Sequence, residues 1–129
     1  MVRGWAILAA AGLAGCAGGE GGVKKSSTGS LRHVVLFKFK DGAPPDAIRA
    51  IEEKFRTLKD RIPNIIAFEW GTDVSPEKKS EGFTHCFFVT FPDAAARDAY
   101  LPHPAHKEFG ALLRPHLDKV LVVDYVARE

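Results

Sequence analysis

The sequence is poor in the residues and motifs that mark the common nucleotide-binding, metal-binding and disulfide-rich proteins. Its two cysteines, Cys16 and Cys86, are too few for a zinc knuckle or a disulfide framework. It contains no P-loop, no dinucleotide-binding glycine pattern and no HExxH helix. Eighteen basic residues against sixteen acidic ones leave a net charge of only +2, so no strongly basic surface is expected to attract nucleic acid. What is present, 46% hydrophobic and 26% charged residues in a chain of 129, is typical of one globular domain.

Residues 1–15 have the features of a secretory signal peptide. Arg3 is their only charged residue, and the uncharged stretch from Gly4 to Gly15 is too short to span a bilayer as a mature helix. The sequence LAGC at residues 13–16 resembles the bacterial lipobox, which implies cleavage before Cys16 and lipidation of its sulfur. The alternative is a plain signal peptide followed by a chance cysteine.

The lipobox resemblance predicts a protein of the bacterial cell envelope, held to a membrane by its N-terminal lipid and facing outside the cytoplasm. In a Gram-negative host the expected address is the outer membrane, because Ala17 follows the cysteine in place of an acidic residue. Residues 16–30 then form a lipidated cysteine and a linker, whose five glycines and four Ser or Thr residues are typical of a flexible chain. Residues 31–129 form the folded domain.

The folded domain is predicted to be α+β, with the ferredoxin-like order β-α-β-β-α-α-β. Its strands are rich in β-branched and aromatic residues, and its helices begin near proline or aspartate and carry apolar residues at spacings of three and four. A polar loop covers residues 71–82. The predicted strands are 31–40, 65–70, 83–91 and 120–126, and the predicted helices are 45–62, 93–100 and 104–113.

Both faces of the predicted sheet are apolar. Alternation along the first and third strands places His33 and Phe37 on one face with His85 and Phe87. The opposite face carries Val34, Leu36, Cys86 and Phe88. Because two or three short helices cover only one face, we expect a second copy of the chain to cover the other, giving a homodimer.

Five segments of the sequence are distinctive: RHVVLFKFK at 32–40, FEWG at 68–71, GFTH at 82–85, YLPHPAH at 100–106 and LVVDY at 121–125. Together they resemble the stress-responsive A/B barrel family. The resemblance covers about residues 31–126 and implies a dimeric α+β barrel with its helices outside. One branch of that family consists of plant cyclases that close a linear polyketide by an aldol condensation without metal or cofactor.

The resemblance to this cyclase branch implies a catalytic pair, Tyr100 and His106, and two pocket histidines, His33 and His85. Phe55 stands where the plant cyclases have a pocket tyrosine, so one hydroxyl donor is missing and a different substrate is expected. An aldol closure needs a base for an acidic C–H proton and a donor for the developing oxyanion, roles that suit a neutral His106 and the Tyr100 hydroxyl.

We therefore expect a pocket for a small hydrophobic ligand, lined by His33, His85, Phe37, Phe55 and Phe87. If the protein is an enzyme, it is expected to be a cofactor-independent lyase or cyclase, and this ligand is its substrate. Two alternatives stay open. The histidines could be satisfied core residues, in which case the protein is a non-catalytic structural dimer of the envelope. A metal site is disfavoured because Pro104 breaks the helical register between His103 and His106.

Overall fold

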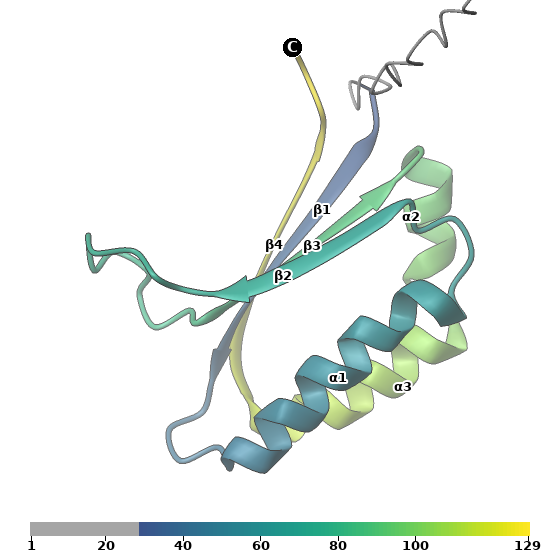
Figure 1. The fold of residues 1–129 in the computed structure, drawn as a ribbon. Coiled ribbons are helices and arrows are strands. Elements are labelled where there is room, and N and C mark those ends of the chain that lie inside the picture. Colours follow the sequence, from purple (N-terminus) through teal and green to yellow (C-terminus); the bar gives the residue numbers. More distant parts are fainter. Residues whose placement is uncertain (1–28) are drawn as a thin grey trace, which may run out of the picture.

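The computed structural model describes residues 29–129 (Figure 1). The order of elements is β-α-β-β-α-α-β, as predicted, with a short 3-10 helix before the last strand. Residues 1–28, which include the predicted signal peptide, Cys16 and nearly all of the predicted linker, lie outside the described part of the chain. The strands are β1 (Leu31–Phe39), β2 (Ala67–Thr72), β3 (His85–Phe91) and β4 (Leu117–Val126); the helices are α1 (Pro45–Arg61), α2 (Ala94–Tyr100), α3 (Pro104–Leu113) and the 3-10 helix η1 (Arg114–His116).

The four strands form one antiparallel sheet in the order β2-β3-β1-β4, which confirms the ferredoxin-like fold. The central strand β1 pairs with both β3 and β4, so that Val35 lies opposite Phe87 on one side and Val122 on the other. The last strand begins at Leu117, three residues earlier than predicted, because Leu117 still finds a pairing partner in Phe39 at the end of β1. Strand pairing, which is non-local, sets this boundary.

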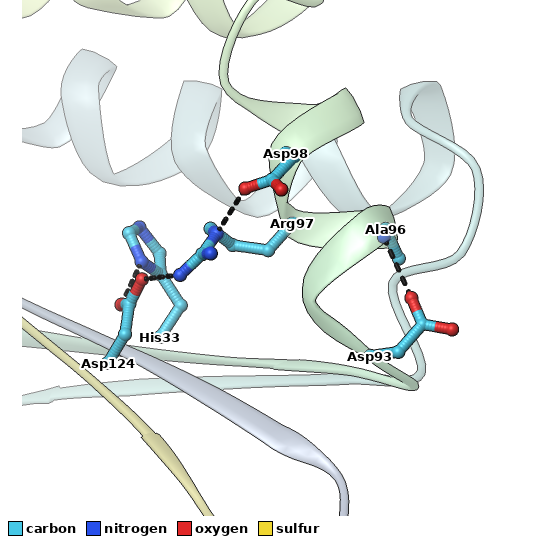
Figure 2. A network of polar contacts seen from close by, with 6 residues as sticks. All are labelled: His33, Asp93, Ala96, Arg97, Asp98 and Asp124. Carbon is cyan, nitrogen blue, oxygen red and sulfur yellow. Dashed lines mark hydrogen bonds and ion pairs between the residues drawn. The ribbon is translucent and has the colours of Figure 1, made fainter.

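Local sequence explains where the helices begin. Pro45 occupies the first turn of α1, where its missing N–H costs no hydrogen bond. The carboxylate of Asp93 accepts a hydrogen bond from the Ala96 N–H at 2.9 Å and caps α2 (Figure 2). In the same way His103 Nδ1 accepts from the Ala105 N–H at 3.0 Å and caps α3. No helix within residues 29–129 is long and apolar enough to cross a membrane.

All three α-helices lie on one face of the sheet, with α1 and α3 side by side (Figure 1). The core between the layers is aromatic. The Phe55 ring of α1 stacks on Phe87 of β3 at 4.2 Å between centroids, and Phe109 of α3 meets Phe55 edge-on at 4.8 Å. Phe37 of β1 joins the same cluster. These contacts fix α1 and α3 against the sheet and leave α2 to pack on the ends of β1 and β3.

The other face of the sheet is uncovered in the single chain, and it is apolar as predicted (Figure 1). We call it the open face. Val34 lies at its centre, opposite Phe88 on β3 and Val123 on β4. The β4 side chains of this face, Leu121, Val123 and Tyr125, are each exposed by nearly half. Contiguous exposed apolar surfaces of this kind mark sites of protein–protein interaction.

Candidate functional site

A cavity of about 290 Å³ lies between the sheet and the helices, at the β1–β4 side of the domain. This volume is at the lower end of the range found for small-molecule sites. Most of its wall is aliphatic or aromatic, and the polar groups are few. The lining residues come from β1, β4, α1, α2 and α3: His33, Val35, Phe37, Phe55, Tyr100, Leu101, His106, Phe109, Gly110, Leu113, Val120, Val122 and Asp124.

The turn between α2 and α3 brings the two residues of the predicted pair together. Tyr100 is the last residue of α2, and its carbonyl accepts from the His103 N–H at 3.1 Å, which closes the turn. Pro104 then starts α3 and places His106 in its first turn. The rings of Tyr100 and His106 have centroids 4.6 Å apart, and the His33 ring lies 5.7 Å from Tyr100. Tyr100 thus lies near two imidazoles on the cavity wall.

The hydrogen bond of His106 defines which of its ring nitrogens is free. Its Nδ1 lies 2.9 Å from the carbonyl oxygen of Leu101, and because a carbonyl only accepts, Nδ1 carries the proton. Burial lowers the pKa of His106; the bond to Leu101 opposes this shift, and the nearby His33 adds to it. The side chain is therefore neutral at pH 7, with its lone pair on Nε2. A neutral imidazole in an apolar wall is a competent general base.

Tyr100 is suited to the opposite role. Only 1% of the residue is exposed, and this burial raises the pKa of its phenol well above the ordinary value, so the hydroxyl stays protonated. No hydrogen bond joins that hydroxyl to another of residues 29–129, and no fully buried side-chain polar atom among them lacks a partner. The hydroxyl must therefore border accessible space, which here is the cavity that Tyr100 lines. It is free to donate to a ligand.

His33 is held by a chain of polar contacts that spans three elements (Figure 2). Its Nδ1 lies 2.6 Å from Asp124 Oδ1 on β4, and Arg97 Nη1 on α2 donates to the other oxygen of Asp124 at 2.6 Å. Arg97 also donates from Nε to the exposed Asp98 at 2.8 Å. Burial alone would raise the pKa of the Asp124 carboxyl, but the bonds from Arg97 and His33 outweigh it and hold that pKa below its usual range. The Asp124 anion thus accepts from the His33 Nδ1–H and leaves Nε2 as the free nitrogen.

His85 and Phe87 do not line this cavity, contrary to the expectation from the strand pattern. They do share a face with His33, but the antiparallel register pairs His85 with Phe37 and His33 with Val89. The two histidines are therefore about four residues apart along the sheet, or about 13 Å at 3.3 Å per residue. Phe87, opposite Val35, is fully buried beneath the Phe55 ring and belongs to the core.

His85 has its own set of contacts near the loop that precedes β3. Its Nε2 lies 2.8 Å from Glu52 Oε1 on α1, and its Nδ1 lies 2.8 Å from Thr84 Oγ1. The indole of Trp70 stacks parallel to the ring at 6.1 Å. With both nitrogens bonded, His85 fits the description of a satisfied core histidine that joins α1 to β3.

Sequence reasoning missed Glu52, the partner of His85, and Arg97, the partner of Asp124. Arg97 precedes Tyr100 by three positions, so the two share a face of α2, and this spacing was the available signal. For the metal alternative, His103 Nδ1 is already used in capping α3. Within residues 29–129 no group of three or more His, Cys, Asp or Glu side chains is placed to hold a metal ion.

Comparison with known proteins identifies the family of this domain. The model of the stress responsive A/B barrel domain matches residues 31–127. A stress-response A/B barrel domain-containing protein, HS1 of Arabidopsis thaliana, is 42% identical over 101 residues, covering 78% of this chain and 93% of that protein. Olivetolic acid cyclase of Cannabis sativa is 33% identical over 100 residues, covering 78% and 99%.

Two solved structures resemble the fold closely. Hydroxynitrile lyase from Passiflora edulis superimposes with a TM-score of 0.72 at 28% identity, covering 78% of this chain and 94% of that one. A dimeric ferredoxin-like protein of unknown function from Jannaschia sp. does so with a TM-score of 0.68 at 32% identity, covering 77% and 100%. These relatives consist of little more than the matched domain, which therefore folds in them without further domains. The chain belongs to the stress-responsive A/B barrel family.

Proposed function

We propose that this protein binds a small, largely apolar carbonyl compound in the cavity and catalyses proton transfer on it with side chains alone. The observation that carries the proposal is the pairing of Tyr100 and His106. A neutral imidazole and a protonated phenol stand 4.6 Å apart between ring centroids, in a wall that is mostly apolar. Lyase and cyclase reactions both fit this chemistry.

The proposed step moves one proton and one electron pair. His106 Nε2 accepts a proton from the carbon next to the carbonyl, and the C–H electron pair passes into the enolate, whose oxygen carries the negative charge. The Tyr100 hydroxyl donates a hydrogen bond to that oxygen as the charge develops. The enolate then takes the proton back from His106, or it attacks a second carbonyl of the same molecule. That attack closes a ring by forming a C–C bond, and the resulting alkoxide takes the proton from His106 to become a hydroxyl. His33, held by Asp124, supplies a further acceptor beside Tyr100.

The relatives support a reaction of this general kind and leave the substrate open. One is named as a cyclase and another as a lyase. The cyclase resemblance also marks a difference, since Phe55 of this chain lines the cavity where a tyrosine is expected. Without that hydroxyl, we infer a substrate with one polar group fewer at the α1 side.

We also propose that the protein works as a homodimer joined through the open face. The support is the exposed apolar surface around Val34, Phe88 and Val123 together with the dimeric state of the Jannaschia relative. The cavity lies on the opposite side of the sheet, beneath the helices, so a second copy on the open face leaves the cavity free.

The location of the protein is proposed from sequence alone. The LAGC sequence at residues 13–16 supports lipidation of Cys16 and attachment to a membrane of the bacterial envelope, with the folded domain facing outside the cytoplasm. Several acyl chains, each contributing about 0.8 kcal/mol per buried methylene, would make that attachment firm.

Exchange of carbon-bound protons tests the catalytic proposal without knowledge of the natural substrate. The protein is mixed with 4-phenyl-2-butanone in D2O, and loss of the α-proton signals is followed by NMR. We expect catalysed exchange by the wild type and a drop of about 10²–10⁴-fold in His106→Gln and in Tyr100→Phe. His116→Gln is the matched control, because His116 lies in η1 outside the cavity. Equal rates in the wild type and His106→Gln would refute the role of His106 as base.

The same experiment separates the alternatives. Binding of the ketone, seen as a rise in melting temperature, without any catalysed exchange indicates a binding protein. A wild type that neither binds nor exchanges, with a lower melting temperature in His106→Gln, supports the non-catalytic structural dimer.

A further inference from the structure

Gly110 occupies an unusual place in the cavity wall. It is the seventh residue of the ten-residue helix α3, well inside the helix. Glycine is the poorest helix former after proline, because it loses the most backbone freedom on folding. A glycine at such a position needs a reason in the folded structure.

Neither the backbone nor packing supplies that reason. The φ angle of Gly110 is not in the left-handed region that favours glycine. A Cβ built on it meets only the Arg114 side chain, with Nη2 at 3.7 Å, which is an ordinary van der Waals contact. Alanine would therefore fit the helix without displacing any neighbour, and it would form that helix better.

The remaining distinctive feature of Gly110 is that it lines the cavity. Gly110 follows His106 by four residues, so the two lie on one face of α3, about one helical turn or 6 Å apart. Both line the cavity, as does Leu113 one turn further. The polar groups of the cavity lie at the His106 end, whereas the wall beyond Gly110 is formed by apolar residues.

We propose that Gly110 is a specificity-determining residue, whose bare backbone admits an apolar ring or alkyl group extending from the reacting carbonyl along α3. The inference rests on the proposed function. It assigns the ligand a defined shape: a carbonyl head at His106 and Tyr100, and an apolar tail reaching at least one helical turn away. A side chain at position 110 would occupy the place of that tail and leave the head unaffected.

A series of phenyl alkyl ketones, from acetophenone to octanophenone, tests this proposal. Binding to residues 29–129 is measured by thermal shift and calorimetry for the wild type, Gly110→Ala and Gly110→Leu. We expect Gly110→Ala to melt a few degrees higher than the wild type. Its affinity for the longest ketones is expected to fall about tenfold or more, with less than about a twofold change for acetophenone. Gly110→Leu is expected to bind only the shortest members.

Gly71→Ala is the matched control. Gly71, on β2, has no heavy atom within 4 Å of its built Cβ and lies outside the cavity, so its replacement should not change affinity at any chain length. If the affinity of Gly110→Ala changed with ketone chain length in the same way as that of the wild type, the inference would be overturned and the proposed function would stand. A lower melting temperature in Gly110→Ala would also overturn it, because the glycine would then serve packing. No binding of any ketone by the wild type would overturn both proposals.

Discussion

The open face offers a sharp test of dimerisation through the substitution Val123→Asp. Val123 lies on the edge strand β4, opposite Val34 of β1, and it is 48% exposed in the single chain. Its partners in the single chain are therefore few, and the core lies on the other side of the sheet. We expect the substitution to leave the monomer folded and to weaken the dimer.

The size of the effect follows from burial. Complete burial of a Val or Leu side chain is worth about 1.5–3 kcal/mol, so the exposed halves of Leu121 and Val123 in two copies contribute about 4 kcal/mol to association. An unpaired carboxylate in a dry interface costs about 3–5 kcal/mol. Since 1.4 kcal/mol is a factor of ten in an equilibrium constant, the dissociation constant should rise at least a hundredfold.

Sedimentation velocity of residues 29–129 over a range of concentrations measures this change. Val74→Asp is the control: it makes the same substitution in the loop after β2, where the side chain is 91% exposed and lies outside the strands of the open face. Circular dichroism checks that both variants fold. A wild type that is monomeric at micromolar concentration, or a Val123→Asp variant that dimerises as tightly as the wild type, would refute dimerisation through the open face.

Three further predictions follow from the sequence and the site. Folding lowers the pKa of His106 below its ordinary value of 6.5. Between the folded and the unfolded pKa the unfolded chain therefore binds more protons, so the free energy of unfolding should fall as the pH drops below about 6.5. Denaturant titrations at pH 7.5 and 5.5 should show a smaller difference in His106→Gln than in the wild type. Asp124→Ala leaves two donors without their acceptor and should cost about 1–3 kcal/mol by denaturant titration, whereas Asp98→Ala at the exposed end of the network should cost less than about 0.5 kcal/mol (Figure 2). Cys16→Ser should abolish lipid labelling and membrane recovery in a bacterial host, and a wild type recovered unlabelled and free of the membrane would contradict the lipoprotein hypothesis.

Much of the fold was predictable because it depends on local sequence. The proline at the start of α1 and the capping aspartate before α2 fix where these helices begin. Alternation along β1 and β3 assigned each residue to a face of the sheet. Both faces were apolar and the helices could cover only one of them, which implied that a second copy of the chain covers the other. The closeness of Tyr100 and His106 was also predictable, because both belong to one seven-residue segment that contains a proline turn.

The rest of the site depends on strand register and on contacts between residues far apart in the chain. Alternation places His33 and His85 on one face, but only the pairing of His85 with Phe37 shows that they lie at different ends of the sheet. His33 meets Asp124 across 91 residues, and Arg97 reaches that same carboxylate from a helix. A sequence pattern specifies the period and the face of each element. The position of one element along another is decided by the packed sheet, because every strand pair is fixed by hydrogen bonds and side-chain fit along its whole length.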